Sequence, residues 1–458
     1  MAGTTLGFWT DARVREALGL PPAGAGGGGA PYTEISTDTR KLRPGALFVA
    51  LKGERFDGHD HLEAARTAGA TGAVVRRGTP AVPGLRLYEV EDTLVAYGRL
   101  ARALRRAIPG PVVAVGGANG KTSTKEMCAA VLRARYRVHA TPANDNNLVG
   151  IPQTILAAPP DAEALVIEAG ASIRGELVRA REVIEPSIVI TTNVAASHLD
   201  GFGSVAGVLE EELDLIRGAD LAIVGPDPPE LARRARQVAR RVIVAGLEGG
   251  ERCPERVTLD ASGRPTLWVD GLAITLPLLG RHQAGNAMLA WTLGRELGVP
   301  PGEAARRLGC LVIPGGRGEV IERDGLTIVN DAYNANPASF RAAIATAAAL
   351  RPGRRLVFVA GTMRELGNEA DAHHAAIAQA LVELEPDLLA AVGAFVPALE
   401  PYRSRLGNRL LTAPDAASLG PLLAARVRPG DLVVLKASRG EALERIIPHL
   451  TGQDYRTH

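Results

Sequence analysis

Short apolar runs alternate with longer amphipathic segments along most of this chain. Such runs are typical of strands buried on both faces of a parallel sheet, and the segments between them have the period of helices. The runs lie at residues 47–51, 72–76, 112–115, 164–170, 187–193, 221–225, 326–331, 355–361, 387–393 and 431–438. The pattern predicts an α/β fold in which crossover helices connect mostly parallel strands.

The length of 458 residues exceeds one ordinary core and indicates about three domains. We predict an N-terminal domain at 1–88, a central domain at 89–313 with a doubly wound sheet, and a C-terminal domain at 314–458. A glycine-rich tract at 23–30 is expected to be flexible, and a β-rich passage at 256–278 interrupts the central domain.

Composition excludes several classes of protein. A net charge of +2 gives no reason to expect a nucleic-acid partner or binding to an acidic membrane surface. The three cysteines, Cys128, Cys253 and Cys310, form no metal-binding pattern and fit a reducing compartment. The N-terminus lacks the pattern of a signal peptide, and no apolar run reaches about 18 residues. We therefore expect a cytoplasmic protein without membrane insertion.

Residues 112–127, VVAVGGANGKTSTKEM, join a strand to a helix through a glycine-rich turn. The first N–H groups of a helix have no partner within it, and with the helix dipole they form a site for an anion. Lys121 supplies a charge for phosphate, and the Thr122 hydroxyl can ligate magnesium. Val115 stands where the usual phosphate loop has glycine, so the spacing here is shorter. We predict nucleoside triphosphate binding, with an ordinary glycine-rich turn as the alternative.

Two further side chains follow buried strands of the same predicted sheet. Glu168 closes one strand, where open α/β sheets place ligand-binding groups, and His198 follows the next. Taken alone, Glu168 could be a surface strand end and His198 a packing residue. Beside a phosphate loop both become candidates for a magnesium site. Because magnesium prefers oxygen, His198 could instead act through a water or a phosphate.

Polar residues cluster in three later segments, at 144–154, 330–337 and 435–444. The first two are rich in amides, which suit either a turn or a dense set of hydrogen bonds. In the third, Lys436 and Arg439 stand just past a strand, where they could hold a carboxylate or phosphate or begin a solvated helix.

Together these residues resemble the Mur ligases of peptidoglycan synthesis, most closely their MurF branch. The resemblance runs from about Ser36 to Arg445. The motifs, in chain order, are STDTRKLRPGALFVALKGERFDGHD, GANGKTSTKEM, NNLVGIPQT, VIEAGASIRGEL, TNVAASHLDGFGS, GRHQAGNA, NDAYNANPASF, GTMRELGNEADAHH and LKASRG. The short glycine spacing is that of the Mur phosphate loop, and the AYNANP and ELG segments favour the MurF branch.

The resemblance implies three domains: one that binds the UDP end of the substrate, a central phosphate-loop domain for ATP, and a Rossmann-like ligase domain that closes over the site. It implies an ADP-forming amide ligase that adds D-Ala-D-Ala to UDP-N-acetylmuramoyl-tripeptide (UDP-MurNAc-tripeptide) through an acyl phosphate. ATP and Mg²⁺ are the implied cofactors, and a monomer is expected.

The same resemblance implies roles for individual residues. Positions that match nucleotide-binding residues are Gly117, Ala118, Asn119, Gly120, Lys121, Thr122, Ser123, Asn286 and Arg317. Positions that match substrate-binding residues are Thr39, Arg40, Asn146, Asn147, Asn334, Asn336, Lys436 and Arg439. Positions with catalytic roles are Lys121, Glu168, His198 and Asp331, the last at the ribose and hinge. Thr122 and Glu168 are the implied magnesium ligands, with His198 beside them.

Three positions depart from the family pattern. Many Mur ligases carry a carbamylated lysine after the histidine segment, whereas this chain has Glu212 there, or Glu210 or Glu211 in a shifted register. We hypothesise that the Glu212 carboxylate replaces the carbamate at a second magnesium; a charged helix face is the alternative. Gln283 replaces a usual asparagine and puts a nucleotide contact in doubt, and Thr362 replaces a usual aspartate near the acceptor site.

Two other functions stay open on the sequence. One is a ligase of the same superfamily with a different acyl donor or amine, as in the folylpolyglutamate and cyanophycin enzymes. The other is a nucleotide-binding homologue without ligase activity.

Overall fold

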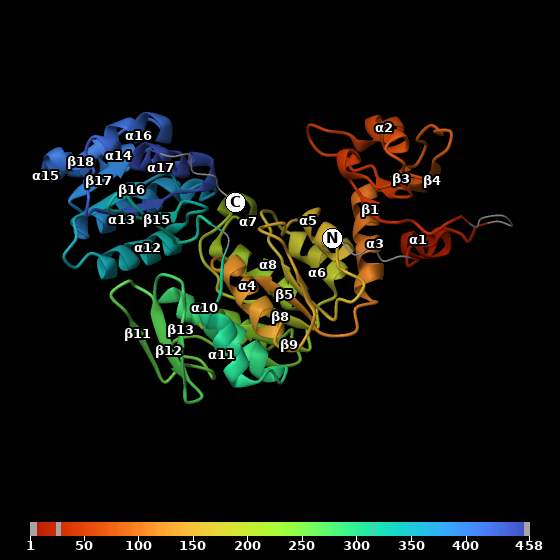
Figure 1. Cartoon of the computed structure of the whole chain (residues 1–458), viewed down its shortest axis with the longest axis horizontal. Helices are drawn as coiled ribbons and strands as arrows, with labels where there is room; N and C mark the ends of the chain where they lie inside the picture. The colour runs from red at the N-terminus through yellow and green to blue at the C-terminus, as the bar shows by residue number, and fades with distance from the viewer. Residues whose placement is uncertain (1–6, 24–28, 314, 453–458) are drawn as a thin grey trace. The chain divides into compact units, whose positions relative to one another are not determined.

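The computed structural model describes residues 7–23, 29–313 and 315–452 (Figure 1). The chain clusters into two compact units. One takes in the described residues of 1–116, 135–171 and 175–189, and the other those of 117–134, 172–174 and 190–458. Most of the tract that we expected to be flexible, at 24–28, lies outside the described residues. Within the described ranges, no helix has both the length and the apolar character needed to cross a bilayer.

The N-terminal part of the first unit is a four-stranded parallel sheet of order β1-β2-β3-β4. All three residues of β2 are buried, which explains the continuous apolar run there. Asp92 caps α3 by accepting the Leu94 N–H at 2.8 Å. The elements are α1 (Asp11–Leu18), β1 (Ile35–Ser36), β2 (Leu47–Val49), α2 (Leu62–Thr67), β3 (Gly72–Arg76), β4 (Arg86–Val90) and α3 (Thr93–Arg105).

The next sheet has six strands in the order β10-β9-β8-β5-β7-β6, and strand β8 belongs partly to each unit. Parallel pairing joins β6 to β7, β7 to β5 and β9 to β10. Every residue of β5, β7, β8 and β9 is buried, as the apolar runs predicted. The elements are β5 (Val112–Gly116), α4 (Lys121–Leu132), β6 (Val138–Ala140), α5 (Gly150–Leu156), β7 (Ala164–Glu168), α6 (Glu176–Ile184), β8 (Ile188–Thr191), α7 (Leu199–Phe202), α8 (Val205–Ile216), β9 (Leu221–Val224), α9 (Pro229–Ala235) and β10 (Val242–Val244).

The β-rich passage forms an antiparallel sheet of three strands, followed by two helices. These elements are β11 (Arg256–Leu259), β12 (Pro265–Val269), β13 (Leu272–Thr275), α10 (His282–Glu296) and α11 (Pro301–Gly309). The interruption of the doubly wound pattern is therefore confirmed.

The C-terminal sheet has the order β14-β15-β19-β16-β17-β18, parallel except for β14. Two apolar cores, one around Phe358 and one around Val357, contain alternate residues of β16. The elements are β14 (Glu319–Arg323), β15 (Leu326–Asp331), α12 (Pro337–Leu350), β16 (Leu356–Ala360), α13 (Ala370–Glu383), β17 (Leu388–Ala391), α14 (Phe395–Leu399), α15 (Arg403–Leu406), β18 (Leu410–Thr412), α16 (Ala416–Ala424), β19 (Leu432–Lys436) and α17 (Ile447–Thr451). The carboxyl ends of β15, β19 and β16 meet at one edge, where a parallel sheet carries its ligand-binding loops.

Candidate active site

The turn between β5 and α4 has a backbone that only glycine adopts easily. Gly117 has φ +115° and Gly120 has φ +79°. A Cβ at Gly117 would lie 2.1 Å from the Thr192 hydroxyl, and one at Gly120 would lie 2.7 Å from Asn286 Oδ1. The packing of this loop thus requires glycine at positions 117 and 120.

Protein acceptors hold the loop before the helix begins. The Gly117 N–H donates to Glu212 Oε1 at 2.8 Å, and the Ala118 N–H donates to the Asn193 carbonyl at 2.9 Å. Asn193 also clamps Asn119, accepting its N–H at 3.1 Å and donating to its carbonyl at 3.1 Å. The predicted nucleotide contacts at Gly117, Ala118 and Asn119 therefore cannot use these N–H groups in this conformation, which leaves the first turn of α4 to bind an anion.

Helix α4 begins at Lys121, as predicted, and presents the expected phosphate-binding groups. Lys121 Nζ donates to the Gly117 carbonyl at 2.7 Å, so the ammonium folds over its own loop. Thr122 and Ser123 are buried in the first turn, at 2% and 5% exposure. The dipole of α4, the ammonium and the two hydroxyls suit a polyphosphate.

Glu212, in the acidic run of α8, contacts the phosphate loop. Its side chain is buried, its Oε1 accepts from Gly117, and its Oε2 has no hydrogen-bond partner among the described residues. Burial raises the pKa of Glu212 to about 7, against the opposing charge of Lys121. Glu210 instead pairs with Arg234 at 2.7 Å on the surface. The structure therefore favours Glu212 over Glu210 as the site carboxylate.

Glu168 ends β7 in the other unit and is held by an amide. Asn146 Nδ2 donates to Glu168 Oε1 at 2.8 Å, and the Glu168 N–H donates to the Thr141 hydroxyl at 2.9 Å. Asn147 accepts the N–H groups of Val149 and Gly150 at 3.0 and 2.8 Å, so it fixes the start of α5. Asn146 is thus brought to a predicted site residue, whereas the Asn147 side-chain oxygen serves the backbone.

His198 precedes α7 in the left-handed conformation, with φ +50°. Its Nδ1 forms an ion pair with Glu365 Oε2, from the loop after β16. Among the residues that the structure describes, no group of three or more His, Cys, Asp or Glu side chains is arranged to hold a metal ion. The predicted metal ligands are divided between the two units, with Glu168 in one and Thr122, His198 and Glu212 in the other.

The substitution at Gln283 has a clear structural consequence. Gln283 Oε1 accepts from Asn286 Nδ2 at 3.1 Å, and both side chains are buried. The longer amide therefore orients Asn286, whose side chain lies against Gly120 of the phosphate loop.

Asp331 and Lys436 end adjacent strands and form an ion pair in which Lys436 is buried and Asp331 is partly exposed. Lys436 Nζ lies 2.7 Å from Asp331 Oδ2 and donates to the Asn334 carbonyl at 2.8 Å. We expected Lys436 just past its strand, but it is the last residue of β19, and its charge is paired inside the domain. Lys436 therefore shapes the predicted acceptor side by fixing Asp331 and the 330–337 loop.

Asn336 has two structural roles at the start of α12. Its side chain accepts the Ser339 N–H at 2.9 Å in a capping box, and its Nδ2 donates to Asn119 Oδ1 at 2.8 Å. The second bond joins the 330–337 loop to the phosphate loop. Asn334 Oδ1 accepts the Ala335 N–H at 2.9 Å, a local turn bond.

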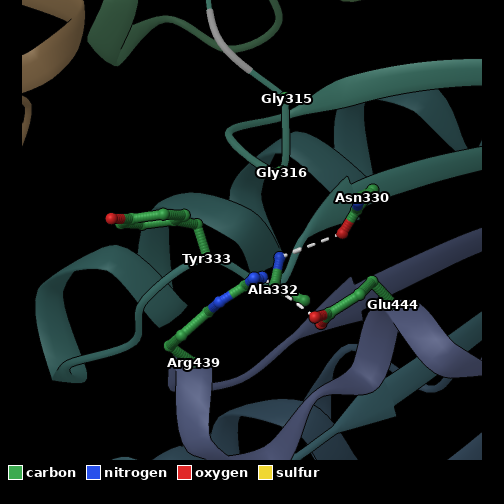
Figure 2. A pocket seen from close by; sticks show the side chains of 7 residues that line it. All are labelled: Gly315, Gly316, Asn330, Ala332, Tyr333, Arg439 and Glu444. Carbon is green, nitrogen blue, oxygen red and sulfur yellow. Dashed lines mark hydrogen bonds and ion pairs between the residues drawn. The ribbon is translucent and has the colours of Figure 1, made fainter. Parts of the chain in front are cut away.

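Two predicted site arginines share one aromatic ring. The guanidinium of Arg317 lies 3.9 Å from the centre of the Tyr333 ring, and that of Arg439 lies 5.9 Å from it. Arg439 also donates to Glu444 at 2.9 Å (Figure 2). This corner contains a small pocket whose lining is Gly315, Gly316, Asn330, Ala332, Tyr333, Arg439 and Glu444 (Figure 2).

The remaining predicted positions lie at other strand ends. Thr39 and Arg40 form a short 3-10 turn after β1, where the exposed Arg40 pairs with Asp38 at 2.8 Å. Thr362, after β16, accepts the Ala394 N–H at 3.0 Å, so its hydroxyl ties two strand ends together.

Sequence reasoning missed Asn193, Tyr333 and Glu365 as residues that touch the predicted site. Asn193 and Tyr333 lie inside segments already identified as motifs, two residues after the ends of β8 and β15, so their place at the carboxyl edge was a usable signal. Glu365 contacts His198 across 167 positions of sequence, and no local pattern indicates that contact.

A glycine-shaped phosphate loop at the carboxyl edge of a parallel sheet, joined to a second α/β domain, defines an ATP-using enzyme class with several domains. Three family models match: "Mur ligase family, catalytic domain" at 31–106, "Mur ligase middle domain" at 115–294 and "Mur ligase, glutamate ligase domain" at 316–439. The chain belongs to the Mur ligase family.

Several of its relatives and structural neighbours are MurF ligases. The UDP-N-acetylmuramoyl-tripeptide–D-alanyl-D-alanine ligase of Bacillus subtilis is 35% identical, over 91% of this chain and 92% of the relative. The Escherichia coli enzyme of that name is 34% identical, over 90% and 92%. A crystal structure of MurF from Acinetobacter baumannii has a TM-score of 0.86 at 27% identity, over 97% and 99%. MurF from Thermotoga maritima, solved with ADP, has a TM-score of 0.79 at 29% identity, over 91% and 96%. The predicted three-domain α/β fold is confirmed.

Proposed function

We propose that this chain is an ADP-forming ligase that joins D-Ala-D-Ala to UDP-MurNAc-tripeptide in peptidoglycan synthesis. The observation that carries the proposal is an intact phosphate loop in a chain that aligns over nine-tenths of its length with ligases of that activity. We further propose domain boundaries at 1–88, 89–313 and 314–458. Because ATP is an intracellular substrate, we place the enzyme in the cytoplasm, and we propose that it acts as a monomer.

The chemistry activates a carboxylate, which by itself is a poor acylating agent. Transfer of the γ-phosphoryl group of ATP to the tripeptide carboxylate gives an acyl phosphate and ADP. The amine of D-Ala-D-Ala then attacks the carbonyl carbon, phosphate leaves, and an amide bond forms. Water would destroy the acyl phosphate, so domain closure protects it.

Several residues of the phosphate loop would act on the nucleotide. Lys121 would move from the Gly117 carbonyl to the β- and γ-phosphates, where its charge offsets that of the phosphates. The first turn of α4, with Thr122 and Ser123, would bind the phosphates. Asn286 and Arg317 would contact the rest of the nucleotide, and Asp331 the ribose.

We propose that magnesium binds beside the phosphate loop. Thr122, Glu168 and Glu212 offer oxygen donors, which magnesium prefers, and Glu212 Oε2 is buried with no hydrogen-bond partner among the described residues. When bound, magnesium supplies positive charge to the transferring phosphoryl group. We propose that Glu212 supplies the negative charge that a carbamylated lysine supplies in many relatives, and that His198 lies beside the metal.

The substrate ends would bind at opposite ends of the chain. We propose Thr39 and Arg40 for the UDP end, and Asn146 and Asn147 along the path of the peptide. The acceptor would bind near the C-terminal residues Asn334, Asn336, Lys436 and Arg439.

Phosphate release from ATP, combined with the product mass, tests the proposal. We expect turnover to require both UDP-MurNAc-tripeptide and D-Ala-D-Ala, and the product to be heavier by the dipeptide less one water. Turnover only with another amine would indicate a different acceptor, for which Thr362 is the observation in favour. Absence of turnover with every acceptor, in a protein that still binds ADP, would favour a non-catalytic homologue.

A further inference from the structure

The loop after β16 reaches both the side chain and the backbone of the His198 segment. Glu365 Oε2 pairs with His198 Nδ1, and the Glu365 carbonyl accepts the Leu199 N–H at 2.8 Å. A single residue of the C-terminal domain therefore contacts both the imidazole of His198 and the backbone N–H of the next residue.

Both partners of this contact have uncommon backbone conformations. His198 has φ +50° and Glu365 has φ +63°, in the left-handed region that residues other than glycine rarely adopt. Such conformations persist only where surrounding contacts enforce them, and they cluster at functional sites. The paired strain indicates that this contact is a built feature of the fold.

The neighbours of Glu365 anchor its loop firmly. Leu366 is buried in the C-terminal core, at 2% exposure. The Arg364 N–H donates to the Ser438 hydroxyl at 2.9 Å, and the Arg364 guanidinium pairs with Glu441 at 2.9 Å. Glu365 is thus presented toward His198 from a rigid support on both sides.

We propose that Glu365 is a positioning residue for His198, an inference that rests on the proposed ligase function. The two side chains form an ion pair without hydrogen-bond geometry in this conformation. When a hydrogen bond forms between them, the carboxylate holds the ring proton on Nδ1 and leaves Nε2 available to the reacting groups. Because Glu365 comes from the domain proposed to bind the amine, His198 is correctly oriented only when that domain is docked.

A second contact, independent of the first, links the same two regions. Asn336 Nδ2, at the start of α12, donates to Asn119 Oδ1 in the phosphate loop at 2.8 Å. The C-terminal domain thus touches the nucleotide site at two places, His198 and Asn119.

The test compares Glu365→Ala and Glu365→Gln with the natural protein. Alanine removes the acceptor at Nδ1, and we expect kcat to fall about 10- to 100-fold with little change in the KM for ATP. Glutamine keeps an acceptor oxygen, so we expect it to restore much of the rate. In a His198→Ala background, Glu365→Ala should cost nothing more. A full additional loss in that background would overturn the proposal, as would natural kcat in Glu365→Ala.

Glu369→Ala is the matched control. Glu369 lies four residues after Glu365 and also pairs with a histidine, His373, at 3.3 Å. We expect natural activity from this variant. An equal loss of kcat would mean that any charge change in this segment is damaging, and it would refute a specific role for Glu365.

Nitrogen NMR of the imidazoles, recorded without substrates, separates this proposal from the proposed function. We expect the proton of His198 on Nδ1 in the natural protein and in Glu365→Gln, and a shifted tautomer balance in Glu365→Ala. An unchanged spectrum in Glu365→Ala overturns the positioning role even if ligation is confirmed. A changed spectrum in a protein without ligation would confirm the contact and reject the ligase assignment.

Discussion

Replacing Glu212 with glutamine tests the buried carboxylate under the phosphate loop. The amide can still accept the Gly117 N–H, so the change removes charge with little loss of shape. Burial raises the pKa of Glu212 from its ordinary value of 4.5 to about 7. The folded protein therefore binds a proton that the unfolded chain has released, and the free energy of unfolding falls as pH rises from about 4.5 to about 7. At about 1.4 kcal/mol per pH unit, this cost amounts to about 3 kcal/mol above pH 7.

Urea unfolding of Glu212→Gln across this pH range, without magnesium, measures the effect. We expect the variant to be more stable than the natural protein by up to about 3 kcal/mol at pH 8, and equally stable near pH 4.5. Glu210→Gln is the matched control on the same helix, because Glu210 is exposed and its loss should change stability by under about 1 kcal/mol. A folded Glu212→Gln that gains no stability at pH 8 would refute the burial argument.

Magnesium and bicarbonate extend the same experiment to function. Magnesium with ADP should stabilise the natural protein more than Glu212→Gln, because the buried Glu212 carboxylate then binds the metal. We expect Glu212→Ala to lose activity and Glu212→Lys to regain it only with bicarbonate, which supplies the carbamate carbon. If Glu212→Lys is indifferent to bicarbonate and Glu212→Ala is harmless, Glu212 does not replace the carbamate.

Three further changes are expected to have measurable effects. Burial lowers the pKa of His374, so the stability that its neutral ring contributes is present above the ordinary pKa of 6.5 and is lost as pH falls. In urea unfolding, His374→Ala should lose this pH dependence and about 2 kcal/mol of the free energy of unfolding, and an unchanged profile would contradict us. Asp11→Asn removes a buried carboxylate that accepts the Tyr88 hydroxyl at 2.6 Å, and should cost about 3 kcal/mol in thermal or urea unfolding; a variant as stable as the natural protein would count against this. Gly117→Ala places a Cβ 2.1 Å from the Thr192 hydroxyl, so calorimetry should show ADP binding lost, and natural affinity would mean that the loop adapts.

The parts of the fold that sequence predicted are those set by local pattern. The strand at Val112–Gly116 and the helix at Lys121–Leu132 follow from an apolar run, glycines and a helix start that lie within about twenty residues. Short edge strands such as Val138–Ala140 were not predicted, because a half-buried strand of three residues has no period to detect.

The sequence indicates which residue types lie near the candidate site, but it does not indicate which side chains contact one another there. Lys436 was expected just past its strand and is the last residue of β19, and its charge is paired with Asp331 on the neighbouring strand. That pairing depends on strand order. The chain runs from β16 through β17 and β18 at one side of the sheet before β19 returns to lie between β15 and β16. A sequence without a sheet order cannot show which strand ends become neighbours, so a paired lysine and a ligand-binding lysine look alike.

The amide side chains around the phosphate loop form contacts that the sequence alone does not indicate. Asn119 has its backbone clamped by Asn193 and its side chain held by Asn336, from elements 74 and 217 positions away. Since the Asn119 backbone is fixed by the central sheet, movement of α12 acts on its side chain alone. Loss of the Asn336 bond would therefore release the side chain while the loop kept its shape. The phosphate loop can thus keep its backbone shape whether or not the Asn336 bond is made.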